Sequence, residues 1–420
     1  MKRIVSFFAA FALCISLYAQ QSEFITLAGK AIDGTSREPL KFVSVGLKGT
    51  NISNVTNSEG VFTLKVPAGT PEDAVVVLSC LGFNDLEARV TQFEGCTSDD
   101  PLLLAMIPAI YRLPAIVVGM TDAEYLVSQA YNSIKQNYPT THVGMTAFYR
   151  ELIKKGNTKY LSLNEAVLDI DKTSYTSFQA DRAGIYKGRG TVNYDASDTL
   201  FVKYQGGVSS SLSIDLMKNP FAGVVLKDIF DVYDFSVEGS AVQDDRIFTV
   251  VSFSQRPEFE EMLFRGKMYI DPDTYAVGRV EFNMNVEGRP SAASLFILKS
   301  PAKTKFTVDE AAYVVNYKEK DGKWYYDYAS INLAFTAKHK LSPFRQHYTI
   351  SSELAITDFA PGQIEITDES RLRLRDQLSE KVSDFTDESF WENYNVIEPD
   401  ASIDAIVRKI VRQLKRRETK

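Results

Sequence analysis

The sequence predicts a multidomain fold that begins with an all-β sandwich, continues with an α+β domain built on a large antiparallel sheet, and ends in a helical segment. Three patterns predict it. Short alternating apolar runs separated by turn residues occupy residues 25–90, longer aromatic and β-branched runs fill residues 145–354, and apolar residues return to helical spacing after residue 399. A chain of 420 residues has room for two or three domains with cores of their own.

Residues 1–19 are expected to form a cleaved export signal. Lys2 and Arg3 precede the apolar residues 4–17, and Ala19 is a small residue of the kind that a signal peptidase prefers. Cleavage after Ala19 would take the formal net charge from −7 to about −9. That acidic balance argues against a nucleic-acid binder. No later segment approaches the run of about eighteen apolar residues that a transmembrane helix needs.

The first domain is expected over residues 20–118. Apolar residues fall at every second position in residues 43–47 and again in residues 62–66, as half-buried strands require, and the turn residues 57–60 precede the second run. The apolar residues 115–118 predict a closing strand, after which a linker leads out of the domain.

This stretch is similar to the carboxypeptidase-like regulatory domain. The resemblance rests on the opening Gly29-Lys30-Ala31-Ile32-Asp33, the V-x-V-x-L-K-G-T strand from Val43 to Thr50, the T-x-x-x-G-x-F-x-L hairpin from Thr56 to Leu64, and the closing Ser79-Cys80-Leu81-Gly82-Phe83. It implies a small prealbumin-like β-sandwich, a domain common at the front of Gram-negative envelope proteins, including TonB-dependent receptors. About 300 residues follow the domain, too few for the barrel of such a receptor. The resemblance therefore implies an exported protein of the periplasm or the outer-membrane periphery.

Two cysteines, Cys80 and Cys96, lie beyond the expected leader. An oxidising envelope would allow them to form a disulfide, whereas the shared parity of Cys80 with Val76 and Leu78 favours a buried thiol. The sequence does not give the Cα separation on which pairing depends, so both states remain open.

The second domain is expected over residues 119–360 and begins with a helix. Thr121 and Glu124 have the spacing of a capping box, apolar residues then recur at helical spacing, and Pro139 ends the helix. The glycine- and serine-rich residues 204–211 predict a loop that could rim a pocket. Antiparallel strands are expected at residues 145–153, 160–170, 247–253 and 262–270.

The clearest hairpin has Asp321-Gly322 at its tip, a strong two-residue turn signal. Pairing outward from the turn gives the cross-strand pairs Glu319 with Trp324, Tyr317 with Tyr326, and Val315 with Tyr328. This register would place them on one face, whose possible ligand-binding residues are Tyr317, Trp324, Tyr326 and Tyr328. Such a face can bind an apolar or glycan ligand, or it can pack against a helix as part of the core.

A helix followed by a long antiparallel meander, with the turn G-x-x-Y-I-D-P-x-T-x-A-V from Gly266 to Val277, resembles the curved half-barrel of lipoprotein carriers and related envelope proteins. This second resemblance implies that the large sheet is curved and half-barrel-like. A curved sheet wrapped partly around a helix can leave an apolar concavity for a ligand.

Residues 361–420 are expected to be helical. Leu372, Leu378 and Val382 mark one segment, and apolar residues line one face of residues 403–414. Basic residues occupy the rest of that last helix. It could therefore rest on anionic lipid headgroups as a peripheral membrane contact, or dock on its own domain.

Few residues have the types and spacing that catalysis requires. The histidines His142, His339 and His347 begin no H-x-x-E or H-E-x-x-H motif, which argues against a zinc carboxypeptidase and predicts no bound metal. Two carboxylate pairs remain, Asp169 with Asp171 and Asp271 with Asp273. A glycosidase needs two carboxyls facing a cleft, but aspartate at a strand end is usually a turn former.

The predicted function is that of a non-catalytic binding or assembly protein at the periplasm or outer-membrane periphery of a Gram-negative envelope. It would need no cofactor, and its partner would be an unidentified envelope protein or an apolar or glycan molecule. The alternative hypothesis is an envelope hydrolase with a carboxylate-based site. A purely structural adaptor without a small ligand is a third hypothesis.

Overall fold

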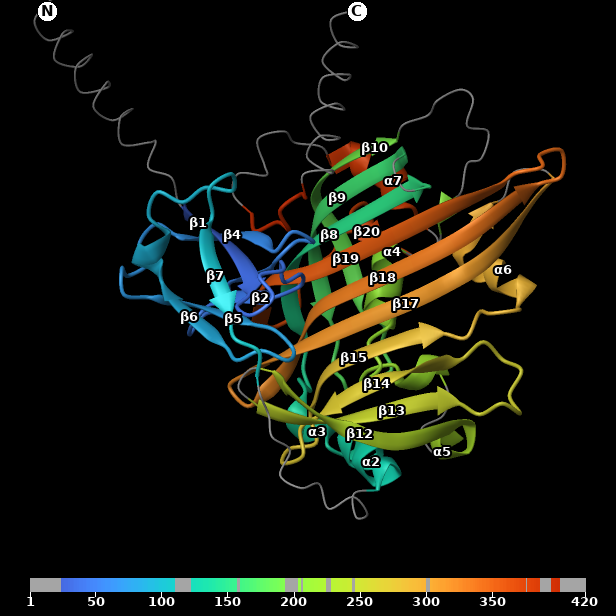
Figure 1. The fold of residues 1–420 in the computed structure, drawn as a ribbon, viewed down its shortest axis with the longest axis horizontal. Helices are drawn as coiled ribbons and strands as arrows, with labels where there is room; N and C mark the ends of the chain where they lie inside the picture. The colour runs from blue at the N-terminus through green and yellow to red at the C-terminus, as the bar shows by residue number, and fades with distance from the viewer. Residues whose placement is uncertain are drawn as a thin grey trace, which may run out of the picture.

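The computed structural model describes residues 24–109, 122–156, 159–192, 203–204, 207–223, 228–243, 246–299, 303–374, 376–385 and 394–400. The predicted leader (1–19), closing strand (115–118) and last helix (403–414) lie outside these residues. The described chain forms a β-sandwich beside a large sheet (Figure 1). This arrangement confirms the predicted fold class, in which an N-terminal β-sandwich is followed by a domain with a large antiparallel sheet.

The sandwich consists of two small sheets with the strand orders β4-β1-β7 and β3-β2-β5-β6. The residues that alternate in the sequence, among them Val43, Val45, Phe62 and Leu64, are fully buried between the sheets. Its elements are β1 (Phe24–Asp33), β2 (Ser44–Leu47), β3 (Ser53–Val55), β4 (Val61–Pro67), β5 (Val75–Ser79), β6 (Leu86–Arg89), η2 (Val90–Phe93) and β7 (Leu102–Met106).

The second body is an 11-stranded sheet in the order β12-β13-β14-β15-β17-β18-β19-β8-β9-β10-β20. Neighbouring strands are antiparallel, and the four predicted strands correspond to β8, β9, β13 and β14. The strands are β8 (Val143–Lys155), β9 (Lys159–Lys172), β10 (Arg182–Val192), β12 (Tyr233–Gln243), β13 (Arg246–Gln255), β14 (Phe264–Ile270), β15 (Val277–Met284), β17 (Thr304–Lys320), β18 (Lys323–His339), β19 (Arg345–Pro361) and β20 (Arg371–Leu372). A separate pair joins β11 (Lys203–Tyr204) to β16 (Ile297–Lys299).

Short helices cover one face of the large sheet, which we call the inner face. Their apolar residues share a core with the inner-face residues of the strands, for example Val315 and Leu354. The opposite, outer face carries Phe148, Tyr328 and Ala355, which cluster with Val55 of the sandwich. The helices are α2 (Ala123–Asn132), α3 (Ile134–Asn137), α4 (Gly207–Ser213), η3 (Pro220–Gly223), α5 (Ile229–Val232), η5 (Pro290–Ala292) and α6 (Ala293–Phe296).

Two of these helices differ from the prediction. Helix α2 is capped by Asp122 rather than by the predicted Thr121, which lies outside the described residues; the Asp122 side chain accepts a 2.9 Å hydrogen bond from the Glu124 N–H. Residues 204–211 were expected to be a loop, but residues 207–211 belong to α4, which packs onto the inner face. As predicted, the helical segment ends before Pro139.

The described part of residues 361–420 is less helical than predicted. Leu372 lies in β20, which pairs with β10, while Leu378 and Val382 begin α7 (Leu378–Lys381) and η6 (Val382–Phe385). Residues 394–400, here called the connecting segment, are irregular and lie between the two bodies. Among the residues that can be described, no helix is long and apolar enough to cross a membrane.

The connecting segment joins the sandwich to the outer face of the sheet. The Asn395 side chain accepts a 2.7 Å hydrogen bond from the Lys65 N–H of β4, and the Arg150 guanidinium of β8 donates to the Ile397 carbonyl at 2.7 Å. Ile397 is 1% exposed in the apolar cluster between the bodies. The bodies also touch directly, because the Gly82 N–H donates to the Val242 carbonyl at 2.7 Å.

Candidate functional site

Three of the four aromatic residues of the predicted ligand face lie on the inner face of the sheet. Tyr317, Trp324 and Tyr326 are 1%, 2% and 0% exposed. The Tyr317 and Tyr326 ring centroids are 6.2 Å apart and the rings meet edge to face. Helix α4 lies over them, since the Tyr326 hydroxyl donates to the Ser211 carbonyl. In the structure these three side chains are therefore core residues.

Tyr328 lies on the outer face, so the prediction that it shares a face with the other three is wrong. The pairs nearest the turn follow the predicted register, but beyond them Asp327 is an extra residue in the ladder, and Asn316 rather than Val315 stands opposite Tyr328. Such a β-bulge inverts the side-chain alternation of the strand beyond it. Tyr328 instead packs against Phe42 of the sandwich, with ring centroids 5.5 Å apart.

A buried charge cluster closes the inner face beside these rings. Lys172 Nζ lies 2.6 Å from Asp181 Oδ2 and 2.7 Å from Asp215 Oδ2, and Lys218 Nζ lies 2.7 Å from Asp181 Oδ1. The Tyr317 hydroxyl donates to Asp215 Oδ1 at 2.6 Å. The four charged side chains are at most 3% exposed, so the cluster is shielded from solvent.

In this cluster, burial and the neighbouring charges shift the pKa values of the side chains in opposite directions. Burial by itself would raise the pKa of Asp181, but Lys172 and Lys218 outweigh burial and lower that pKa below its usual value. Burial would likewise lower the pKa of Lys172, but Asp181 and Asp215 raise it above its usual value. The charged forms of Asp181 and Lys172 are thus favoured by their neighbours, whereas burial lowers the pKa of Lys218 although Asp181 acts in the opposite direction. This pattern favours a structural role in fastening the segment after α4 to the sheet.

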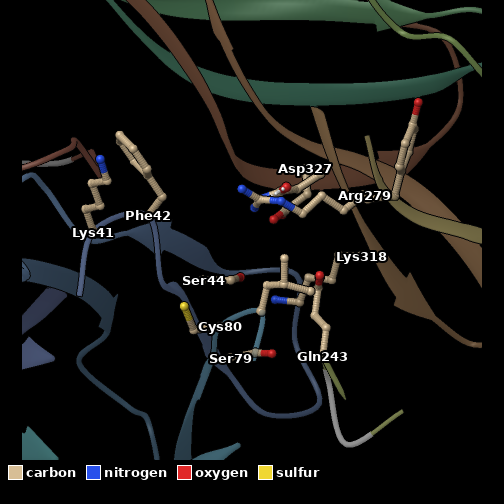
Figure 2. Close-up of a pocket in the computed structure, with 12 residues that line it drawn as sticks. Lys41, Phe42, Ser44, Ser79, Cys80, Gln243, Arg279, Lys318 and Asp327 are labelled. Atoms are coloured by element: carbon tan, nitrogen blue, oxygen red, sulfur yellow. Dashed lines mark hydrogen bonds between the residues drawn. The ribbon is translucent and has the colours of Figure 1, made fainter. Parts of the chain in front are cut away.

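A cleft of about 190 Å³ lies where the sandwich meets the large sheet (Figure 2). Three cationic side chains and one carboxylate line it, which gives it a positive charge. The sandwich contributes Lys41, Phe42, Ser44, Ser79, Cys80 and Leu81, and the sheet contributes Gln243, Arg279, Asn316, Tyr317, Lys318 and Asp327. Figure 2 shows Arg279, Lys318 and Asp327 approaching the cleft from the sheet, opposite Ser44 and Cys80.

Two cations of the cleft are held differently. Arg279 is fixed by its Nε, which donates to Glu281 Oε1 at 2.6 Å, and by its Nη1, which donates to Asn316 Oδ1 at 2.9 Å. The half-buried Lys318 points at the sandwich, where a Cβ built on Gly46 would lie 2.7 Å from Nζ. Within the described ranges, no carboxylate forms an ion pair with Lys318. A partly dehydrated ammonium group without such a partner can bind an anion.

The disulfide that the sequence left open is not formed, because Cys80 and Cys96 are both thiols. Cys80 follows the last residue of β5 and lines the cleft. Cys96 follows η2, which is tied to the opposite end of β5 by the hydrogen bond from the Val90 N–H to the Ala74 carbonyl. At about 3.3 Å per residue, β5 separates its ends by more than the roughly 4.4–6.8 Å between Cα atoms that a disulfide allows.

In each carboxylate pair considered for the hydrolase alternative, one aspartate is engaged in other contacts. Asp271 Oδ1 accepts hydrogen bonds from the backbone N–H groups of residues 273 and 274, at 2.9 and 3.2 Å, as a turn-forming aspartate does. Asp171 lies 2.6 Å from Arg182 and 2.8 Å from His142. None of these carboxylates lines the cleft. In the part of the chain that is described, no group of histidine, cysteine, aspartate and glutamate could hold a metal ion.

Sequence reasoning did not find the cleft. Lys318 and Asp327 lie on the predicted hairpin, and strand alternation from the inward Tyr317 could have indicated that Lys318 points outward. The residues of the sandwich side, 41–44 and 79–81, lie in or next to segments that carry the domain resemblance. No pattern in the sequence indicates that these two sets of residues meet, because they meet only through the packing of one body on the other.

Comparison with known proteins identifies the first domain. Residues 27–104 match the family model of the CarboxypepD_reg-like domain. A search of curated proteins found no match. Residues 27–104 are therefore a CarboxypepD_reg-like domain, as the motifs between Gly29 and Phe83 predicted.

Similar solved structures cover the larger part of the chain at low similarity. A DUF1329 family protein from Desulfovibrio piger is 12% identical, with 59% of this chain and 96% of that chain covered and a TM-score of 0.25. A LolA superfamily protein from Nitrosomonas europaea is 11% identical, with 58% and 96% covered and a TM-score of 0.23. The MucA/MucB complex from Pseudomonas aeruginosa is 11% identical, with 58% and 100% covered and a TM-score of 0.19. At such TM-scores the structural likeness carries no argument about function. The family match is confined to residues 27–104.

Proposed function

We propose that the protein is a non-catalytic binding protein of a Gram-negative cell envelope, and that it holds an anionic group of its ligand or partner in the cleft between the sandwich and the large sheet. Lys318 carries the proposal. Lys318 is half-buried, its ammonium group lies next to Gly46, and it has no carboxylate partner among the residues described. The resemblance of the first domain to those at the front of envelope proteins supports the location.

The chemistry of the cleft favours a small acid over an apolar ligand. Arg279 is held in position before any ligand arrives, so little side-chain entropy would be lost when it binds. Lys318 and Arg279 can each donate charge-assisted hydrogen bonds to a carboxylate or phosphate. Phe42 supplies an apolar wall, and a cavity of about 190 Å³ accommodates a small charged group rather than a long chain.

The rest of the molecule supports binding rather than catalysis. Of the aromatic residues first considered as a ligand face, Tyr317, Trp324 and Tyr326 are buried in the inner-face core, and Tyr328 packs against Phe42 of the sandwich. One aspartate of each pair considered for catalysis is engaged elsewhere, because Asp271 forms a turn and Asp171 forms an ion pair. Binding at the cleft uses groups from both bodies, so it would also couple ligand binding to their association.

Calorimetric titration with succinate, inorganic phosphate and neutral glucose tests the site. Lys318→Met should weaken succinate or phosphate binding by at least about tenfold, which corresponds to about 1.4 kcal/mol. Lys267→Met is the matched control, because Lys267 is an exposed lysine of β14 paired with Glu238 at 2.7 Å, and it should bind like the wild type. Binding of neither anion, or equal binding by Lys318→Met, would contradict the proposal.

The proposed location has its own test. Fractionation of the native cell should recover the protein in the periplasmic or outer-membrane fraction, with an N-terminus at or near Gln20. Recovery of a chain that keeps Met1 in the cytoplasm would contradict export, whether or not the cleft binds an anion.

A further inference from the structure

The end of the large sheet farthest from the sandwich carries two exposed apolar side chains. Strands β18 and β19 extend to a turn at this end, at the right of Figure 1. In that turn Leu341 is 76% and Phe344 75% exposed. The turn is ordered: the Ser342 N–H donates to the His339 carbonyl at 3.1 Å, and the Phe344 N–H donates to Ser342 Oγ at 3.2 Å. The fold therefore holds both apolar groups in solvent.

Basic side chains surround this turn. Lys338 stands opposite Lys305 on one side and opposite Arg345 on the other, and the Lys340 N–H donates to the Lys303 carbonyl at 2.9 Å. All five side chains are exposed, and no carboxylate of the described residues forms an ion pair with any of them. Like charges directly across a sheet destabilise it, so sheet formation gives no reason for this arrangement.

The hairpin of β8 and β9 adds further basic residues next to this turn. Gly156, which follows β8, lies beside β19, because its N–H donates to the His347 carbonyl at 2.8 Å, and β8 ends with Lys154 and Lys155. The whole chain has a formal charge of −7, so the positive charge at this end is a local feature. Exposed apolar residues within a basic border have the composition of a surface that contacts anionic lipid.

We propose that this tip, defined as residues 338–345 together with Lys303 and Lys305, docks on the surface of an anionic lipid bilayer. Leu341 and Phe344 enter the boundary between headgroups and acyl chains, where they leave water. The basic side chains remain at the headgroups, to which anionic lipids attract them. A narrow, projecting turn suits a bilayer, which yields to small inserted groups, better than a folded partner, which requires a broad complementary surface. This contact is separate from the cleft.

Tryptophan quenching in vesicles with brominated acyl chains tests the insertion directly in the full chain. Phe344→Trp should show a blue shift and strong quenching, relative to the wild type, with vesicles of about 30% phosphatidylglycerol in phosphatidylcholine. Phe178→Trp is the control, because Phe178 is fully exposed in the loop after β9, at the other end of that strand from the tip. It should show neither effect.

Charge dependence completes the test. Lys338→Glu with Lys340→Glu should weaken vesicle binding of the Phe344→Trp protein by at least about tenfold, as should 0.5 M salt or vesicles of phosphatidylcholine alone. Quenching of Phe344→Trp no greater than that of Phe178→Trp would overturn the proposal even if the protein sediments with vesicles, because the contact would then lie elsewhere. Failure to bind anionic vesicles at all, or equal binding to neutral ones, would also overturn it.

Discussion

Tyr317 and Asp215 are 102 positions apart in the sequence, yet the Tyr317 hydroxyl donates a 2.6 Å hydrogen bond to Asp215 Oδ1. Through this bond the aromatic hairpin joins the buried charge cluster, and the segment after α4 is held on the inner face of the sheet. The half-barrel resemblance suggested a concavity that could be open. At this hairpin the inner face is covered by the protein's own chain.

Truncation of the inner-face aromatic residues should destabilise the protein. Tyr326→Ala and Tyr317→Ala each remove a buried ring and a hydrogen bond, so the free energy of unfolding should fall by about 3–5 kcal/mol. Phe178→Ala, at a fully exposed ring, should change it by less than about 0.5 kcal/mol. Urea unfolding measures all three. Wild-type stability in both tyrosine variants would show that this face is not part of the core.

Removal of one charge from the buried cluster should be costly. Lys172→Met leaves Asp181 and Asp215 buried with less compensation, so we expect a loss of about 3–5 kcal/mol. Lys48→Met is the control. It breaks the Lys48–Glu87 pair, whose side chains are 60% and 53% exposed, and should cost less than about 1 kcal/mol. Similar losses in the two variants would argue against the cluster as a structural element.

Glu151 should make the protein less stable as the pH rises. Its buried carboxyl lies near the start of α4, and the Tyr149 hydroxyl donates to it at 3.2 Å. Burial raises its pKa to about 7, although hydrogen bonds from Tyr149 and Asn164 act in the opposite direction. Between the ordinary value of 4.5 and about 7, the folded state binds more protons than the unfolded state, so the free energy of unfolding falls as pH rises.

The variant Glu151→Gln should remove this pH dependence. Its stability relative to the wild type should increase by roughly 3 kcal/mol between pH 4 and pH 8, measured by urea unfolding at each pH. Glu310→Gln, at an exposed position of β17, is the control and should show little change. A constant difference between Glu151→Gln and the wild type across this range would contradict the raised pKa.

The connecting segment should fasten the sandwich to the sheet. Ile397→Ala removes a 1% exposed side chain from the cluster that includes Val55 of the sandwich and Phe148 of the sheet, so it should cost about 2–5 kcal/mol. Because the cluster joins the two bodies, limited proteolysis should also release fragments more rapidly. Ile107→Ala, at a 65% exposed position, should leave both measurements unchanged. Unchanged stability and proteolysis in Ile397→Ala would contradict this prediction, because the other contacts between the sandwich and the sheet would then be enough to hold them together.

The sequence by itself determined the elements whose conformation depends on near neighbours. Asp321 and Gly322 have φ angles of 52° and 76°, the left-handed backbone that a two-residue hairpin turn requires and that an Asp-Gly pair predicts. The alternation through Val43, Val45 and Phe62 likewise predicted which side chains are buried in the sandwich. Such patterns can be recognised because strand side chains alternate between two faces with a period of two residues.

Only the tertiary structure decided the face of Tyr328, the helical state of residues 207–213 and the position of the cleft. A single extra residue, Asp327, reverses which face of the sheet the following side chains of β18 point to, and the amino-acid composition of the strand does not indicate it. A helix as short as α4 is marginal alone and forms here on the packed inner face. The cleft brings Lys318 to Gly46 because the sandwich packs against the large sheet, and the free energy of that contact depends on surfaces that no local pattern describes.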